Sequence, residues 1–382
     1  MHVVPTAAAA APLEALRTTL QGDFVERDEA IDALIRTRVA GHHLIMLGPP
    51  GEGKSMLARY FSLCVGESFF EQLLTKFSTP DDLYGMMLMS AFKNDRYERH
   101  TTSYFQAAQV CFVDETLKGN PGVLNALLTA LNERTWVNDG KVCKLPLRMC
   151  IGASNEYIEG PELAALWDRF LVRLWIDPVK DRANRVRMMQ AGRSRAPQPT
   201  AIQGLDMAKE QHLASHVTID NAVDEAFQDV REAIEKAGRK VSDRRWIQVQ
   251  SLVQAEAHID GRTTARPGDI AVIADAMWNE EGERAEVIRV IQKTVDPTGA
   301  KATQRLDAAR TAFRAMPKDV AAAGGDQQFL GAMVRTNKLL KDIAEELALM
   351  GGGRAVDKVK AEVAMLQQDV GTRALKFSGL GS

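Results

Sequence analysis

The glycine-rich segment after residue 47 is the part of the chain best suited to chemistry, and it reads Gly48-Pro49-Pro50-Gly51-Glu52-Gly53-Lys54-Ser55. The spacing G-x-x-x-x-G-K-S lets successive backbone N–H groups surround phosphate oxygens, because glycine tolerates the required dihedral angles and leaves room for a close approach. Lys54 would reach the β- and γ-phosphates, and the Ser55 hydroxyl would hold Mg²⁺. A glycine-rich turn without a ligand is the alternative. It is disfavoured because a strand-like apolar run, 44–47, precedes the loop and helix-forming residues follow it.

A pair of carboxylates, Asp114 and Glu115, is the second candidate. The pair follows the apolar run 110–113, which has the continuous hydrophobicity of a strand buried on both faces. Ligands bind at the carboxyl ends of parallel strands, so Asp114 would complete the Mg²⁺ shell and Glu115 would polarise an attacking water. An Asp-Glu pair alone is common and usually only solvated; its value comes from lying about sixty residues beyond a phosphate loop.

Two further groups of polar residues follow later strands. Asn155 comes after the apolar run 149–153 and could touch a γ-phosphate or orient water, with a helix cap as the alternative. The region after residue 168 is rich in arginine, and for most of these side chains a solvated helix face is the better interpretation. They are Arg169, Arg173, Arg182, Arg185, Arg187, Arg193 and Arg195.

The remaining patterns predict the elements that must position these residues. Apolar residues at helical spacing predict a helix over 24–40 before the phosphate loop and another over 121–132. The Asn138-Asp139-Gly140 turn predicts a hairpin over 135–145. Beyond residue 200 the patterns are helical throughout, and Ser242 is a plausible cap of one helix.

Composition bounds the class of protein. The chain has 382 residues, 45% of them hydrophobic and 26% charged, with a net charge of -2 and a pI near 6.4. These values argue against a dedicated nucleic-acid partner, and no run of 18 apolar residues predicts a membrane span. The cysteines show no C-x-x-C spacing, which favours reduced thiols in a cytoplasm over disulfides or zinc; they are Cys64, Cys111, Cys143 and Cys150.

In this order, the glycine loop, the Asp114-Glu115 strand, the hairpin, the strand before Asn155 and the segment Asp168-Arg169-Phe170 resemble an AAA+ ATPase. The chain is more closely similar to the MoxR family, particularly its RavA-type members. That closer similarity rests on the segments 74–80, 153–156, 168–175 and 241–246, and the resemblance covers about residues 20 to 280. It implies ATP and Mg²⁺ as the ligands.

The resemblance also implies a role for each matched position. It implies a Walker A loop, a Walker B pair and a sensor-1 residue in the nucleotide site, and it assigns nucleotide binding to Gly48, Pro49, Pro50, Gly51, Glu52, Gly53, Lys54, Ser55, Met56 and Asp114. The metal would be held by Ser55 and Asp114. The catalytic residues would be Lys54, Glu115, Asn155, the arginine finger Arg169 and the sensor-2 residue Arg244. Arg173 and Arg245 are the nearest rivals for the last two roles.

The implied fold is an α/β P-loop AAA+ core, a parallel sheet flanked by helices, followed by an all-α lid and a C-terminal helical domain. We expect a flexible N-terminal tail over 1–20, the α/β domain over 21–192, a linker over 193–204, the lid over 205–280 and the helical domain over 281–382. The segment 84–104 would match a helix-2 insert and 135–145 a pre-sensor-1 hairpin, both facing a central pore. The β-rich insertion of RavA-type proteins is not expected here, because the connection 296–328 has no alternating strand pattern.

These implications converge on a cytoplasmic, hexameric ATPase that remodels or matures a partner protein with a von Willebrand factor A domain. The ATPase subunit of a metal chelatase has the same motif order and is the nearest alternative. A nucleotide-gated scaffold with little turnover is an alternative from another class. A DNA translocase is a third alternative, which the pI disfavours.

Overall fold

We describe the protein from a computed structural model, in which residues 11–157, 161–193, 199–318, 320–350 and 354–377 are described. These residues form two compact units. The core unit consists of the described residues up to Glu225 together with Arg239–Arg284, and the helical unit consists of Ala226–Gly238 and the described residues from Ala285 onward. Helices α10 (Asn221–Lys236) and α12 (Glu281–Val295) each begin in one unit and end in the other.

A five-stranded sheet with the order β2-β3-β6-β1-β7 is the framework of the core unit, and every pairing in it is parallel. Its strands are β1 (Leu44–Leu47), β2 (Phe69–Leu73), β3 (Val110–Asp114), β6 (Met149–Ser154) and β7 (Val172–Trp175). The central strands β1 and β6 are buried along their whole length, as continuous apolar runs in a covered parallel sheet require. The predicted α/β core is therefore confirmed.

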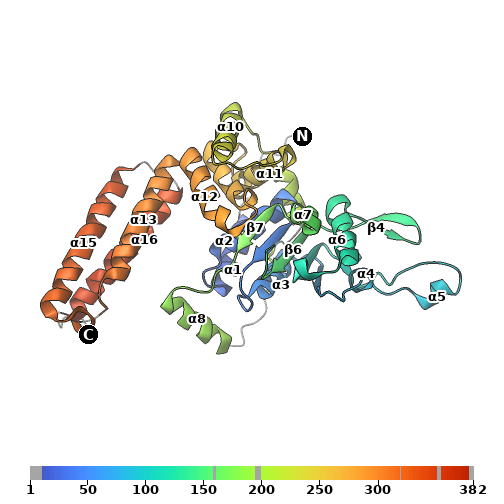
Figure 1. Cartoon of the computed structure of the whole chain (residues 1–382), viewed down its shortest axis with the longest axis horizontal. Helices are drawn as coiled ribbons and strands as arrows, with labels where there is room; N and C mark the ends of the chain where they lie inside the picture. The colour runs from blue at the N-terminus through green and yellow to red at the C-terminus, as the bar shows by residue number, and fades with distance from the viewer. Residues whose placement is uncertain (1–10, 158–160, 194–198, 319, 351–353, 378–382) are drawn as a thin grey trace. The chain divides into compact units, whose positions relative to one another are not determined.

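Helices surround the sheet, and Figure 1 shows them as α1 (Ala11–Asp23), α2 (Asp28–Ala40), α3 (Lys54–Val65), α6 (Pro121–Glu133) and α7 (Pro161–Trp167). The expected tail over 1–20 is wrong for residues 11–20, which belong to α1. Leu13, Leu16 and Leu20 are buried there on one face of the helix, which packs on α2 and α3. The alanine-rich composition concealed this amphipathic spacing. Residues 1–10 lie outside the described residues.

Two segments of the core unit extend away from the sheet (Figure 1). One contains α4 (Pro80–Tyr84) and α5 (Met89–Phe92), and the other is the hairpin of β4 (Thr135–Asn138) and β5 (Lys141–Lys144). The predicted hairpin is confirmed, and its turn places Asp139 and Gly140 at φ values of 50° and 71°. Backbone and side-chain groups join the two segments: Tyr97 N donates to Asp139 Oδ1 (2.8 Å) and Asp139 N donates to Tyr97 O (3.2 Å).

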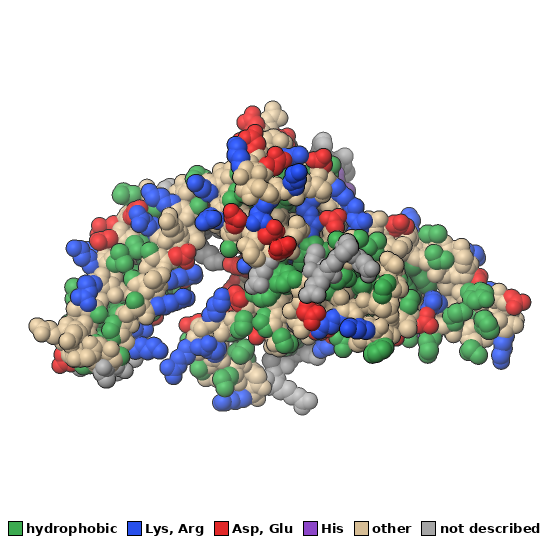
Figure 2. All heavy atoms as spheres, in the orientation of Figure 1, with side chains coloured by type: hydrophobic (Ala, Val, Ile, Leu, Met, Phe, Trp, Pro, Cys, Tyr) green, Lys and Arg blue, Asp and Glu red, His purple; other side chains and the backbone are tan. Residues whose placement is uncertain are grey.

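Large hydrophobic side chains gather on this extension, at its end in Figure 2. Both segments contribute these side chains, and hydrogen bonds connect the two segments. The side chains therefore belong to one connected extension. The exposed members are Met86, Met89, Phe92, Tyr97, Val137 and Val142.

After β7 the chain becomes helical, with α8 (Arg182–Arg193), α9 (Met207–Ala214), α11 (Asp243–Ile259) and the 3₁₀ helix η4 (Pro267–Ala276). Ser242 caps α11 as predicted, its hydroxyl accepting from Arg245 N. The region expected as a lid, 205–280, is helical as predicted, and within the core unit α11 packs on α2 and η4 while η4 packs on β7. The predicted linker 193–204 lies partly outside the described residues; Arg193 ends α8, and 199–204 has no helix or strand.

The helical unit has its own apolar core. Helices α13 (Pro297–Ala315), α15 (Asp326–Leu349) and α16 (Arg354–Phe377) bury one cluster of side chains, including Leu306, Leu340 and Val363. The described residues between 296 and 328 form α13 and the short α14 (Val320–Ala323), in agreement with the expectation that no β-rich insertion occurs there. None of the helices that the structure describes combines the length and apolarity needed to cross a membrane.

Candidate functional site

The carboxyl ends of three neighbouring strands bring the predicted nucleotide-site residues together. The glycine loop follows β1, Asp114 ends β3, and Asn155 follows β6. Because β1 and β6 are parallel and Leu47 is the register partner of Ser154, the loop and Asn155 start from the same level of the sheet. Gly48 N donates a hydrogen bond to Ser154 O at 3.2 Å, which connects the two directly.

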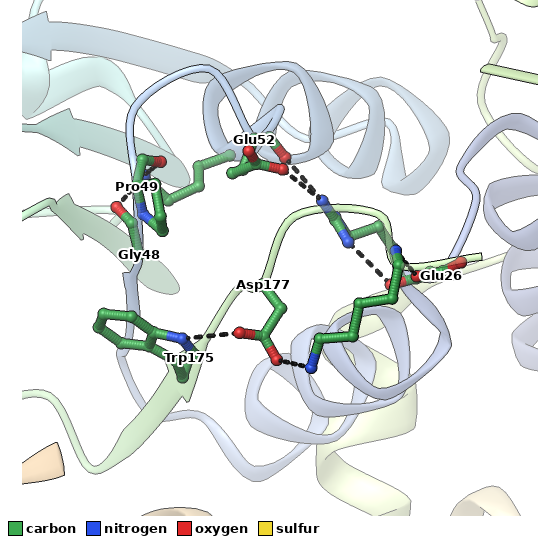
Figure 3. Close-up of polar contacts among 9 residues, drawn as sticks. Glu26, Gly48, Pro49, Glu52, Trp175 and Asp177 are labelled. Atoms are coloured by element: carbon green, nitrogen blue, oxygen red, sulfur yellow. Dashed lines mark hydrogen bonds and ion pairs between the residues drawn. The ribbon is translucent and has the colours of Figure 1, made fainter. Parts of the chain in front are cut away.

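The loop has the backbone geometry that its glycines allow. Gly48, Gly51 and Gly53 have φ values of 141°, 85° and 77°, in the region that other residues rarely adopt. A Cβ atom on Gly48 would come within 2.3 Å of Ile176 O, so this glycine is also required for the close approach of the loop to the segment after β7. The loop and the groups around it are shown in Figure 3.

Lys54 begins α3, and its amine faces back into the loop. Lys54 Nζ donates to Gly48 O and Pro49 O, each at 2.8 Å (Figure 3). Burial lowers the pKa of Lys54, and the nearby carboxylates of Asp114 and Glu115 oppose that shift. Both carboxylates are therefore close enough for their charge to act on the amine.

Glu115 has a strained backbone at the end of β3. Its φ of 49° places a non-glycine residue in the left-handed region, and strain of this kind is concentrated at functional sites. Lys118 Nζ forms an ion pair with Glu115 Oε2 at 3.2 Å, and its interaction with Glu115 is the main cause that raises the pKa of Lys118. Glu115 is thus presented at the carboxyl edge with one cation beside it.

Thr116 is a positioning residue that sequence reasoning missed. Its buried hydroxyl donates to Val113 O at 2.6 Å and accepts from Ala153 N at 3.2 Å, so it fixes the end of β3 against the end of β6. A Cβ atom on Gly152 would lie 3.0 Å from Thr116 Oγ1. Together these residues set the spacing between Glu115 and Asn155.

The donor groups at this edge fit Mg²⁺. Ser55 and Asp114 supply a hydroxyl and a carboxylate, and Mg²⁺ prefers oxygen ligands, with one or two carboxylates and the substrate phosphates completing its shell. Among the described residues no cluster of three or more His, Cys, Asp or Glu side chains could form an all-protein metal cage. When bound, Mg²⁺ would neutralise charge that develops on the phosphate oxygens.

The four candidate arginines divide into two kinds. Arg173 is 1% exposed, donates to Trp278 O and to Asn279 Oδ1 (2.8 Å), and lies with its guanidinium 4.7 Å from the centre of the Trp167 ring. Arg245 is also buried and donates to Ala276 O and Asp168 Oδ1, both at 2.7 Å. These two side chains are bound within the core unit.

Arg169 and Arg244 are the other kind. Arg169 Nη1 lies 3.7 Å from Asp168 Oδ2, and its Nε is buried without a hydrogen-bond partner among the described residues. Arg244 is exposed, and its Nη2 donates to Asn132 Oδ1 at 3.2 Å. Burial is the largest cause that lowers the pKa of Arg169, and the charge of Arg244 lowers it further.

This arginine pair lies at the opposite edge of the sheet from the glycine loop. Arg169 precedes β7, whose first residue, Val172, is the register partner of Leu44 at the start of β1. The glycine loop follows the other end of β1, and a strand of four residues spans about 13 Å. Arg169 and Arg244 are therefore separated from Lys54 of the same chain by the full length of the sheet.

Glu26 and Arg27 are two further residues that sequence reasoning missed. The predicted helix over 24–40 begins at Asp28 instead, because Glu26 is in the left-handed region with a φ of 54°. Arg27 Nη2 lies 3.2 Å from Glu52 Oε2 and 3.3 Å from Glu52 O (Figure 3). Glu52 was the available signal in the sequence, because a carboxylate inside an anion-binding loop requires a cation nearby that neutralises it.

Comparisons with known proteins agree with this geometry. Residues 11–252 match a family model described as the MoxR domain in the MoxR-vWA-beta-propeller ternary systems, and residues 222–291 match one described as an AAA lid domain. A solved structure described as a candidate ATPase from Cytophaga hutchinsonii is similar in fold, with a TM-score of 0.61 at 17% identity. The match covers 76% of this chain and 96% of the chain of the solved structure.

Relatives in sequence include two archaeal proteins and one bacterial chaperone. The chain is 32% identical over 340 residues to the uncharacterized protein MJ0812 of Methanocaldococcus jannaschii, covering 87% of this chain and 91% of that protein. It is 34% identical over 298 residues to MJ0079 of the same organism, covering 78% and 77%. The match to Chaperone MoxR1 of Mycobacterium tuberculosis is 24% over 155 residues, or 40% of each chain. The family model, the archaeal relatives and the order of the motifs together show that this chain belongs to the MoxR family of AAA+ ATPases.

Proposed function

We propose that the chain hydrolyses ATP at a site shared between two copies in a ring. One copy provides the carboxyl edge of its sheet, where Lys54, Glu115 and Asn155 surround the triphosphate and Asp114 and Ser55 hold Mg²⁺. The neighbouring copy provides Arg169 and Arg244 from the amino edge of its own sheet.

The separation of the two edges is the observation that carries this proposal. Arg169 and Arg244 are close to one another, yet they lie at the edge away from Lys54. The rival assignments, Arg173 and Arg245, are disfavoured because both guanidinium groups are already bound inside the core unit. A single copy therefore contains both halves of an ATPase site, but at opposite edges of its sheet, so one copy alone cannot complete the site.

The chemistry requires both halves. Glu115 and Asn155 orient a water that attacks the γ-phosphorus, the bond to the β,γ-bridging oxygen breaks, and ADP and inorganic phosphate leave. Negative charge accumulates on the phosphoryl oxygens and the leaving oxygen, where Lys54 and the neighbour's arginines stabilise it. An arginine supplied by a neighbour is worth about 10³ to 10⁵ in kcat in related phosphoryl-transfer systems, so an isolated copy would be nearly inactive.

The ring would be a hexamer, and its work would be to remodel or mature a partner protein. A von Willebrand factor A domain partner is supported by the family description, which names MoxR, vWA and β-propeller components together. Within the family we favour a RavA-type member without the β-rich insertion. The cysteines are all unpaired, which favours the reducing environment of the cytoplasm.

Mixing two defective variants tests the shared site. Glu115→Gln damages only the carboxyl edge, and Arg169→Ala damages only the amino edge. Each variant alone should be inactive, but in mixed rings some interfaces join an intact carboxyl edge to an intact amino edge. An equal mixture should recover about a quarter of the wild-type rate, because random assembly leaves about a quarter of the interfaces intact.

Phosphate release at saturating ATP and Mg²⁺ is the measurement, and the double variant Glu115→Gln/Arg169→Ala mixed with wild type is the control. In that control every recovered interface must join two wild-type copies. Absence of recovery in the first mixture, with mixed rings verified by native mass spectrometry, would reject the shared site.

A further inference from the structure

Glu52 places a negative charge inside a loop that must receive a highly negative ligand. It occupies the position before Gly53 and Lys54, and its side chain is 19% exposed. A carboxylate so close to a triphosphate would repel it, because charges interact strongly where solvent is partly excluded. The loop therefore needs a cation that neutralises Glu52.

Arg27 is that cation. A single guanidinium nitrogen, Nη2, reaches both the carboxylate and the main-chain carbonyl of Glu52, at 3.2 Å and 3.3 Å. The Arg27 side chain is only 9% exposed, so solvent screens the pair weakly. Its other terminal nitrogen, Nη1, donates to Glu26 O at 2.9 Å, which fixes the guanidinium from the opposite side.

Glu26 anchors this arrangement to the segment after β7 (Figure 3). Its carboxylate accepts hydrogen bonds from Lys180 N (2.7 Å), Asp181 N (2.9 Å) and Asn184 Nδ2 (3.0 Å). Burial works against ionisation of Glu26, but these hydrogen bonds outweigh it and lower the pKa of the carboxyl. The Glu26-Arg27 turn is therefore held at both ends, by the start of α8 and by the glycine loop.

The charges of this pair extend to the phosphate-binding amine. Burial is the main cause that lowers the pKa of Lys54, while Glu52 opposes the shift and Arg27 adds to it. A ligand held by Lys54 would consequently be affected by both charges, which cancel only while the pair is intact.

We propose that Arg27 is a positioning residue for nucleotide binding, which neutralises Glu52 and holds the glycine loop in a form that accepts phosphates. The inference rests on the proposed function, because it concerns the same nucleotide site. It adds a residue that lies outside the glycine loop and outside every motif of the sequence.

The charge of the pair gives an experiment in which the two single variants have opposite effects. Arg27→Ala leaves Glu52 unneutralised and should weaken binding of a non-hydrolysable ATP analogue by about tenfold. Glu52→Gln leaves Arg27 unpaired beside the phosphates and should tighten binding by about threefold. In the double variant both charges are gone, so the affinity should return to within about threefold of wild type.

Calorimetric titration in the presence of Mg²⁺ measures these affinities, with ADP as the second ligand. The loss in Arg27→Ala should be larger for the ATP analogue than for ADP, because the analogue carries more negative charge, and it should shrink at high salt. Arg59→Ala and Glu71→Gln are matched controls, since they break the ion pair between Arg59 of α3 and Glu71 of β2 (2.6 Å) without touching the loop. Neither should change the affinity.

Two results are distinguishable. If the wild-type chain binds no nucleotide, the proposed function fails. If the wild type binds but Glu52→Gln weakens binding as Arg27→Ala does, or the double variant shows no rescue, the pair supports only the shape of the loop and charge neutralisation is rejected. Should Arg27→Ala fail to fold, the sign of the Glu52→Gln effect still decides.

Discussion

The two edges of the central sheet differ in how their charged groups are satisfied. At the carboxyl edge Lys54 is held by carbonyl groups of its own loop, and Glu115 by a neighbouring lysine. At the amino edge Arg173 and Arg245 are bound inside the protein, while the charge of Arg244 lowers the pKa of Arg169. Asp168 lies against both pairs, 2.7 Å from Arg245 Nη2 and 3.7 Å from Arg169 Nη1, and under the proposed function the anion that completes the Arg169–Arg244 pair is the triphosphate of a neighbouring copy. Under the proposed function each edge holds half of a nucleotide site, and the amino edge completes the site of another copy.

Substitution of Arg169 should give the largest effect that distinguishes the two edges of the sheet. Arg169→Ala should lower kcat by about 10³-fold or more, because it removes charge stabilisation from a neighbour's transition state. Binding of ADP should stay unchanged, since the glycine loop lies at the other edge. Phosphate release and ADP titration on the same preparation measure the two properties. A variant that loses ADP affinity while keeping its rate would contradict the separation of the edges.

Arg173 should behave in the opposite way. Arg173→Ala should reduce the free energy of unfolding by about 3 kcal/mol, because it removes a buried charged donor from Trp278 O and Asn279 Oδ1. Arg169→Ala is the matched comparison, and it should change stability by only about 1 kcal/mol, because its guanidinium makes no short hydrogen bond to the core unit. Urea unfolding followed by circular dichroism distinguishes them. Equal destabilisation by both variants would remove the distinction between bound and available arginines.

The smallest expected effect is on stability and concerns Asp168, which contacts both Arg169 and Arg245. Burial raises its pKa, but the hydrogen bond and charge of Arg245 outweigh burial and lower it. A carboxyl with a lowered pKa in the folded state stabilises the protein above pH of about 4, and that stability is lost as the pH falls through the folded pKa.

The Asp168 side chain is 39% exposed, so its contribution is screened by solvent and should not exceed about 1 kcal/mol. Unfolding of wild type and Asp168→Asn should therefore differ by that amount at pH 6 and converge toward pH 3. A difference that grew as the pH fell would show that the Arg245 contact does not stabilise the charged carboxyl.

Local patterns predicted much of this molecule. The glycine loop, the strand before Asp114, the hairpin turn at Asp139 and the Ser242 cap were predictable because each depends on a few neighbouring residues. The assembly of the glycine loop, Asp114 and Asn155 at one edge followed from the general arrangement of parallel strands.

The distinction between neighbouring arginines depended on tertiary packing. Arg244 and Arg245 differ by one position on α11, and only the second lies on the buried face with Val249 and Leu252. Arg173 belongs to β7, and its hydrogen-bond partner Trp278 O comes from a segment about a hundred residues later in the chain. The Arg27–Glu52 pair likewise joins separate elements, so no local sequence motif predicted it.

The hydrogen bonds between Tyr97 and Asp139 have a mechanical consequence. A force applied to the hairpin of β4 and β5 is transmitted to the segment around α5 without passing through the sheet. Under the proposed function, a pull on a bound polypeptide would therefore be shared by both projections.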